Sequence, residues 1–360
     1  MSLARYAAIL SVVLILGPGT GRPGRADDTA SEARIVAVGL DTQSPLLACL
    51  QQADLACRMA ESPLAPLEAA RPVVLVIDAA PVNIKALVAG KEKVDAFLRT
   101  GGWIVLCGLF PDGLDAFNRL VEADHLIRPF RMEEVDLPRP PDPLLRGLTP
   151  SDVFLEAGTW TPEPDAAPLR ADNMFTYIVD TGNIAPFCEL PEPAYWNRDE
   201  AAVGSDHWPP NLVNGLTYHW RFGFTVLPDR QEPTSWPLVF PREERVTGFA
   251  LTPGGIHHRI TSVMLDFGDG GDPLTLAVEP TGARQAFTFE PRRSERLTFT
   301  IREWDDHGSA NAVAVRNMEI HAERPDDFEQ RVQPLLNIGG LVKYPRGKGG
   351  IVLNQLHLLE

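Results

Sequence analysis

The sequence predicts two domains of different class: a three-layer α/β domain with a mostly parallel sheet, and an all-β sandwich inserted near its C-terminal end. Short apolar runs alternate with amphipathic stretches in the first part of the chain. After about residue 192 apolar and polar residues alternate with a period of two, and dense apolar runs return after residue 335. We therefore expect an α/β domain over 34–158 and 335–360, a proline-rich connecting segment over 159–191, and the sandwich over 192–325.

Residues 1–26 predict a secretory signal peptide. A short basic start at Arg5 precedes an apolar run over 7–17, and small residues flank Arg25. The apolar run is shorter than the roughly 20 residues that span a bilayer as a helix. We therefore expect cleavage near Ala26, a secreted or periplasmic protein, and no transmembrane segment after cleavage.

The composition is that of a globular protein, with 44% hydrophobic and 22% charged residues among 360. Cleavage removes three arginines and no acid, so the formal net charge of −15 becomes −18. An acidic surface repels phosphate backbones, and no basic stripe interrupts it. We therefore expect no nucleic-acid partner.

Strands and helices alternate in the first part of the chain. Apolar runs predict buried parallel strands over 34–40, 73–79 and 103–109. Helical spacing of apolar residues predicts helices over 44–60, 83–102 and 114–121. The pair Gly101 and Gly102 stands where a helix C-cap belongs. This alternation is typical of a sheet covered by helices on both faces.

The second part of the chain predicts a series of short antiparallel strands. They are separated by glycine and proline, which favours a β-sandwich. The predicted strands cover 245–252, 259–267, 273–280, 285–291, 296–304 and 312–321.

The C-terminal stretch GGLVKYPRGKGGIVLNQLHLLE, residues 339–360, contains a glycine-rich loop that could bind phosphate or form a tight turn. The motif G-x-x-x-x-G-K-[ST] requires a glycine five residues before Gly347 and a hydroxyl residue after Lys348. Val342 and Gly349 stand at those two positions. The stretch therefore predicts a turn between two apolar strands, with which the chain returns to its first domain.

Four cysteines follow the predicted cleavage site, and the sequence does not determine the pairing of Cys49, Cys57, Cys107 and Cys188. Cys107 ends a predicted buried strand, where α/β enzymes often place a nucleophile. An activated nucleophile needs small residues around it, but Val105 stands two residues before it, and no fitting histidine–acid motif accompanies it. The favoured interpretation is a buried structural thiol.

The sequence gives little indication of a metal site. Neither H-E-x-x-H nor C-x-x-C occurs, so we expect no transition-metal cofactor. The run DFGDGGD supplies Asp266, Asp269 and Asp272 as candidate ligands of a structural calcium ion. Their order does not match a calcium loop, which ends in glutamate, and a turn between strands is the alternative.

The main candidate for ligand binding is the run WDDH, directly after a predicted strand: Trp304, Asp305, Asp306 and His307. An aromatic ring can cover the apolar face of a pyranose while carboxylates accept hydrogen bonds from its hydroxyls. The alternative is a solvated acidic loop with Trp304 partly in the core. Further candidates for carbohydrate binding are Trp208, Trp220, His257 and His258.

The alternating region resembles a galactose-binding-like, discoidin-type jelly roll. The resemblance rests on NLVNGLTYHW (211–220) followed by SWPLVFPREERVTGFALT (235–252) and covers about a third of the chain. It implies glycan binding through loops at one end of the sandwich, and in many such domains a calcium ion. The ligand-contacting residues of the family do not match here one by one, and Asn214 stands where the family has aspartate.

The first domain resembles the class I glutamine amidotransferase-like fold, of the flavodoxin-like type. The supporting stretches are VDAFLRTGGWIVLCG (94–108), PLLRGLTPSDVF (143–154) and GGLVKYPRGKGGIVLNQL (339–356). An active amidotransferase carries a glycine-flanked cysteine and a late histidine-x-glutamate pair, which are absent here. The resemblance therefore implies the non-catalytic type found beside glycoside hydrolases and in exported bacterial proteins.

These observations favour an exported, non-catalytic or accessory protein that binds a glycan or polysaccharide through loops of the sandwich. One alternative is a glycan hydrolase with carboxylates at the domain interface, such as Glu303, Asp305 or Asp306 opposite an acid of the α/β domain. Another is a structural or oligomerisation module. The sequence does not determine the sugar, the oligomeric state or any protein partner.

Overall fold

The chain forms two compact units, one of Met1–Thr181 with Asp327–Glu360 and the other of Gly182–Asp326. The predicted signal peptide and residues 159–176 of the predicted connecting segment lie outside the described residues. No helix among the described residues is long and apolar enough to cross a membrane. The computed structural model describes residues 35–40, 47, 57–68, 74–129, 142–145, 177–190, 212–213, 224–226, 234–254, 257–305, 310–336 and 338–356.

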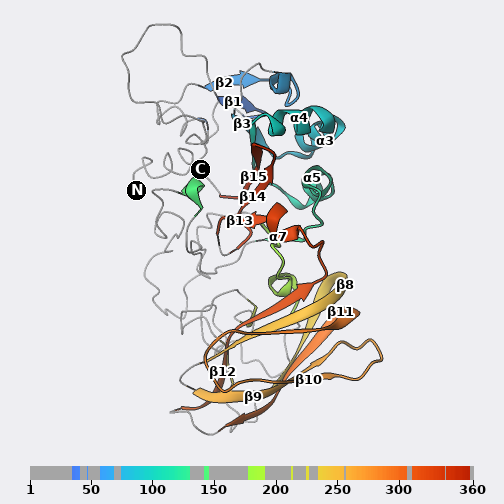
Figure 1. Cartoon of the computed structure of the whole chain (residues 1–360), viewed down its shortest axis with the longest axis vertical. Coiled ribbons are helices and arrows are strands. Elements are labelled where there is room, and N and C mark those ends of the chain that lie inside the picture. Colours follow the sequence, from blue (N-terminus) through green and yellow to red (C-terminus); the bar gives the residue numbers. More distant parts are fainter. Residues whose placement is uncertain are drawn as a thin grey trace, which may run out of the picture. The chain divides into compact units, whose positions relative to one another are not determined.

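A seven-stranded, mostly parallel sheet organises the first unit (Figure 1). Its strands are β1 (Ile35–Val38), β2 (Cys57–Ala60), β3 (Val74–Asp78), β4 (Trp103–Cys107), β13 (Gln333–Pro334), β14 (Leu341–Arg346) and β15 (Gly349–Asn354). They lie in the order β13-β14-β15-β4-β3-β1-β2, and only β13–β14 and β14–β15 pair antiparallel. Every residue of β1 and β15 is buried, as continuous apolar runs predict. The predicted strands over 34–40, 73–79 and 103–109 are confirmed.

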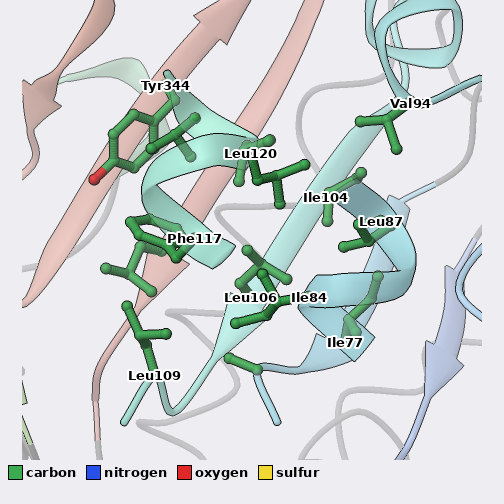
Figure 2. Packing of buried hydrophobic residues seen from close by; sticks show 14 of the residues in the cluster. Ile77, Ile84, Leu87, Val94, Ile104, Leu106, Leu109, Phe117, Leu120 and Tyr344 are labelled. Carbon is green, nitrogen blue, oxygen red and sulfur yellow. The ribbon is translucent and has the colours of Figure 1, made fainter. Parts of the chain in front are cut away.

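Three helices pack on one face of this sheet: α3 (Pro81–Ala89), α4 (Lys91–Arg99) and α5 (Leu114–Val121). Figure 2 shows their apolar side chains beside those of β4. Transfer of such side chains from water is the main favourable term in folding, about 1.5–3 kcal/mol for each large one. The fully buried contacts labelled there include Ile84 and Leu87 of α3, Phe117 and Leu120 of α5, and Ile104 and Leu106 of β4.

The structure corrects two of the helix predictions. The helix predicted over 83–102 is split at Gly90, whose φ of −96° and ψ of 23° lie outside the helical region, and where a Cβ would lie 2.5 Å from Cδ2 of Leu64. Cys57–Ala60, predicted as the end of a helix over 44–60, forms β2 and pairs in parallel with β1. Most of the rest of 44–60 lies outside the described residues, so the third layer of the α/β domain stays a prediction.

The glycine-rich loop near the C-terminus is a tight turn between β14 and β15, as the sequence predicts. Gly347 has a φ of 63°, in the left-handed region that favours glycine. A Cβ on Gly349 would lie 1.9 Å from the carbonyl oxygen of Gly102, so only glycine allows β15 to approach β4 there. The glycines therefore serve chain reversal and close strand approach.

A buried polar network joins β14 to the segment around His125. His125 Nδ1 lies 2.7 Å from the carbonyl oxygen of Asp180, and Nε2 lies 3.0 Å from the hydroxyl of Tyr344. Because a carbonyl only accepts, Nδ1 donates to it, and Nε2 forms a hydrogen bond with the Tyr344 hydroxyl. The side chains of His125 and Asp180 are fully buried, and Asp180 Oδ1 also accepts the amide of Leu126. The network satisfies buried polar groups that are costly to leave unpaired.

Four charged side chains form a second link between the C-terminal hairpin and the helices. Lys91 Nζ lies 2.7 Å from Asp95 and 2.8 Å from Glu122, and Arg346 lies 2.6 Å from Asp95 and 3.1 Å from Glu122. Each cation therefore contacts both acids, a network arrangement that is worth more than an isolated surface pair.

The second unit is a β-sandwich built from long strands (Figure 1). Its strands are β7 (Phe224–Val226), β8 (Ser235–Pro253), β9 (His257–Asp266), β10 (Leu274–Ala277), β11 (Gln285–Asp305) and β12 (Ala310–Ala322). They lie in the order β10-β9-β11-β8-β12-β7 with antiparallel neighbours, and β9 also pairs with β12 in parallel. The short two-stranded sheet of β5 (Ile127–Pro129) and β6 (Tyr177–Val179) belongs to the first unit.

The strands β8 and β11 bend, and each therefore takes part in both layers of the sandwich. Residues 285–288 of β11 pair with the end of β8, whereas 296–300 pair with the start of β8 and with β9. Register shifts between Thr288 and Arg292, and again between Ser294 and Arg296, mark the bend. The separate strands predicted over 285–291 and 296–304 are therefore one strand, and the break at Pro291 is a bulge.

Stacked aromatic rings fill the space between the two layers. The ring centroid of Phe299 lies 5.9 Å from that of Trp236 and 5.8 Å from that of Phe249, and Phe249 is 6.4 Å from Phe287. Trp236, Phe249 and Phe299 are buried. Because Phe249 comes from the second half of β8 and Phe299 from the second half of β11, the stack holds the bent strands together.

We expect Tyr344→Phe to lower the free energy of unfolding of the first unit by about 1–3 kcal/mol, because His125 Nε2 would lose its buried hydrogen-bond partner. Urea unfolding followed by circular dichroism measures this. Tyr177→Phe is the matched control, since Tyr177 packs against Phe110 and its hydroxyl has no hydrogen-bond partner among the described residues. Equal stability of the two variants would contradict the role of the network.

Candidate functional site

Strand register brings two of the candidate segments together at one end of the sandwich. In the pairing of β11 with β9, Trp304 stands opposite Ile260 and Asp305 opposite Arg259. In the pairing of β12 with β9, Ala310 stands opposite His257. The end of β11, the start of β9 and the start of β12 therefore meet, although β9 and the end of β11 are far apart in the sequence.

Trp304 and Asp305 are the two candidates whose side chains the structure describes at this end. Both are half-buried, and Trp304 is paired with the fully buried Ile260 at the edge of the core. Asp305 Oδ1 accepts a hydrogen bond from the backbone N–H of Arg259 at 3.1 Å. This bond fixes one oxygen of the Asp305 carboxylate, and Asp305 directly follows Trp304 in the chain.

The other sugar-binding candidates remain predictions. His257 and His258 occupy the first two positions of β9, so their backbone belongs to the same end of the sandwich. Asp306 and His307 follow β11 directly but lie outside the described residues, as do Trp208 and Trp220.

The calcium candidates lie at the opposite end of β9, in the loop that leads to β10. The Asp269 carboxylate forms two hydrogen bonds of 2.5 Å with Arg292, and its Oδ1 also accepts the amide of Gly271. These bonds from Arg292 hold the pKa of Asp269 at about 2. Asp266 Oδ1 accepts the amide of Gly268. The described residues contain no group of three or more side chains placed to hold a metal ion, and calcium binding stays a prediction.

A charge cluster that sequence reasoning missed fixes the loop between β10 and β11. Arg284 donates two hydrogen bonds of 2.7 Å to Glu319, and His321 Nε2 lies 3.0 Å from the same carboxylate. Burial of Glu319 raises its pKa, but the bonds from Arg284 and His321 outweigh burial and hold the pKa at about 2. No local motif announces this contact, because Arg284 and Glu319 are separated by 35 positions.

Cys107 has the environment of a structural thiol. It ends β4, and Asn354 Nδ2 lies 3.8 Å from its sulfur. Burial is the largest influence on the thiol and raises its pKa to about 12, against a lowering by Asn354 and with a further rise from Asp78. A thiol with this pKa is protonated at neutral pH and is a poor nucleophile. Cys57, Cys107 and Cys188 form no disulfide.

No protein-family model matches the chain, and no curated protein matches it. Solved structures of carbohydrate-binding modules match its C-terminal part. The family 32 module of Streptococcus pneumoniae EndoD matches with 12% identity over 39% of this chain and 99% of that chain, with a TM-score of 0.32. The family 32 module of Clostridium perfringens NanJ in complex with galactose matches with 14% identity over 39% and 97%, with a TM-score of 0.26.

A third match is the C-terminal domain of a chitobiase from Bacteroides fragilis, with 11% identity over 39% of this chain and 97% of that chain and a TM-score of 0.30. Identities under 25% and TM-scores below 0.5 assign neither a ligand nor a binding residue to this chain. The resemblance of the first domain to amidotransferase-like proteins stays a prediction.

We expect Arg284→Gln to destabilise the second unit by about 1 kcal/mol at pH 7, because Glu319 would lose its two strongest donors. A carboxyl group whose pKa is lower in the folded state stabilises the fold at pH values above its unfolded pKa. This stabilisation is lost as the pH falls through its folded pKa. The stability of the natural chain should therefore fall between pH 4.5 and 2, and the variant should show a smaller fall.

Urea unfolding at pH 7 and pH 3 measures the difference. Arg293→Gln is the control, since Arg293 is exposed and its bond to Glu243 is 3.2 Å long. Identical pH profiles of the two variants would show that Arg284 does not hold Glu319 ionised.

Proposed function

We propose that the second unit binds carbohydrate at the end of the sandwich where β9, β11 and β12 meet. The observation that carries this proposal is the strand register that sets Trp304 and Asp305 beside the first residues of β9. An aromatic residue and a carboxylate at one strand end are elements of a pyranose site, and here Trp304 shares the face of Ile260 while Asp305 shares that of Arg259.

Each of the two residues has a distinct part in this proposal. The half-buried indole of Trp304 is anchored by the core and offers an apolar surface to the apolar face of a sugar ring. The Asp305 carboxylate has about four acceptor positions. Its Oδ1 accepts the backbone N–H of Arg259, which orients the group, and in this proposal sugar hydroxyls also donate to the carboxylate.

We also propose that the chain is exported and that its first unit is a non-catalytic scaffold. The predicted signal peptide over 1–26 supports export. The protonated state of Cys107, which occupies the strand-end position of a nucleophile, supports a scaffold role.

Trp304→Ala should weaken binding to a soluble polysaccharide about tenfold or more, because truncation removes the largest apolar contact of the site. Affinity electrophoresis of the full chain in gels that contain single polysaccharides measures this. Phe110→Ala is the control, since Phe110 is an exposed aromatic residue that belongs to the first unit. The proposal fails if no polysaccharide retards the natural chain, or if Trp304→Ala binds as the natural chain does.

A further inference from the structure

Six of the ten arginine side chains that the structure describes in the second unit are neutralised by carboxylates. Arg245 lies 2.7 Å from Glu323, and Arg284 lies 2.7 Å from Glu319. Further pairs join Arg242 to Glu244, Arg292 to Asp269, Arg293 to Glu243 and Arg324 to Glu244. In an acidic chain, this pairing is expected for guanidinium groups wherever a carboxylate is in reach.

Arg259, Arg296, Arg302 and Arg316 depart from this pattern, since none of them has a carboxylate partner among the residues that the structure describes. Arg259, Arg296 and Arg302 are also exposed. The guanidinium of Arg302 has a contact of 3.4 Å from Nη1 to the sulfur of Met264. Arg259 stands opposite Asp305 in the β9–β11 pairing, and Arg302 precedes Trp304 by two residues on β11. Arg259 therefore belongs to the end of the sandwich that carries the candidate site, whereas the Arg302 guanidinium reaches Met264, which pairs with Thr300 further along β9.

Arg259 and Asp305 stand opposite each other in the strand register, yet the structure gives no salt bridge between their side chains. Oppositely charged residues directly across two antiparallel strands commonly form an ion pair. Here Asp305 Oδ1 instead accepts the backbone N–H of Arg259. The Arg259 guanidinium therefore has no carboxylate partner among the described residues, although the facing residue, Asp305, carries a carboxylate.

We propose that the ligand of this site is an anionic glycan, and that Arg259 binds its carboxylate or sulfate group. This inference rests on the proposed carbohydrate binding and adds the chemical class of the sugar. A guanidinium donates two parallel hydrogen bonds to a carboxylate or sulfate, which gives both affinity and a defined orientation. Asp305 and Trp304 then serve the neutral part of the same sugar.

The acidic net charge of the chain does not prevent such binding. At physiological ionic strength charges further than about 8 Å from the ligand are largely screened, so groups in direct contact decide the local attraction. Direct contact with Arg259 is electrostatic, and its contribution should weaken as salt is added. Binding of a neutral glycan at the same site should change little with salt.

The test uses the full chain and four soluble polymers in affinity electrophoresis: polygalacturonate for carboxylates, chondroitin sulfate for sulfates, and galactan and dextran as neutral glycans. We expect one of the two anionic polymers to bind more tightly than both neutral ones, with affinity that falls between 50 and 300 mM NaCl. The anionic polymer that binds identifies the acidic group.

Arg259→Gln should lower the affinity for the anionic polymer about tenfold, and Arg302→Gln should lower it less. The matched control is Arg296→Gln. Arg296 is an exposed arginine of β11 that also lacks a carboxylate partner among the described residues, but it lies beside Gly268 at the other end of β9. All three variants remove one positive charge, so only a positional effect separates them.

Binding to galactan or dextran without binding to either anionic polymer would overturn this inference and leave the proposed carbohydrate binding intact. Equal losses in Arg259→Gln and Arg296→Gln would also overturn it, since net charge alone would then explain the effect. A chain that binds none of the four polymers would contradict both proposals.

Discussion

The pairing of the last strand with the middle of the first sheet is the constraint on which the architecture depends. β15 lies between β14 and β4, with Gly350 opposite Trp103 and Asn354 opposite Cys107. The sheet is therefore incomplete until the final residues of the chain are in place. Gly349 and Gly350 make this possible, because a side chain would collide with the carbonyl oxygen of Gly102 at the first position and with that of Tyr344 at the second. The sandwich of Gly182–Asp326 is formed by the chain between the two parts of that sheet.

A comparable constraint in the sandwich sets the geometry of the candidate site. The register shifts of β11 turn its second half onto β9, and the stack of Trp236, Phe249 and Phe299 holds this bend in the core. Without the bend, Trp304 and Asp305 would not stand opposite the start of β9. The ligand-binding role proposed for these residues thus depends on packing of aromatic rings several residues away.

Much of the fold could be predicted from local patterns, and the departures have physical reasons. Continuous apolar runs identified the central parallel strands, since both of their faces are buried. The helix predicted over 83–102 is split at Gly90, which lies close to Leu64, a contact that no local pattern reports. Likewise, the period of two identified the residues of β11, but Pro291 reads as a strand end in sequence and is part of a bulge in the structure.

The site was predicted only in part, because residue type is visible in a sequence and register is not. The aromatic and acidic character of WDDH singled out Trp304 and Asp305, and the pairing with Arg259 emerged only from the fold. The sequence also does not show which arginines form salt bridges. Arg292 binds Asp269 across 23 positions, whereas Arg259 and Arg302 have no carboxylate partner among the described residues.

Hydrogen–deuterium exchange of the full chain, with and without a polysaccharide that binds it, tests the central claim most directly. The account predicts that bound glycan slows exchange of backbone amides at the start of β9, over 257–262, and at the end of β11, over 301–305. Protection confined to the loop over 267–273 at the opposite end of β9, or to the first unit, would contradict it.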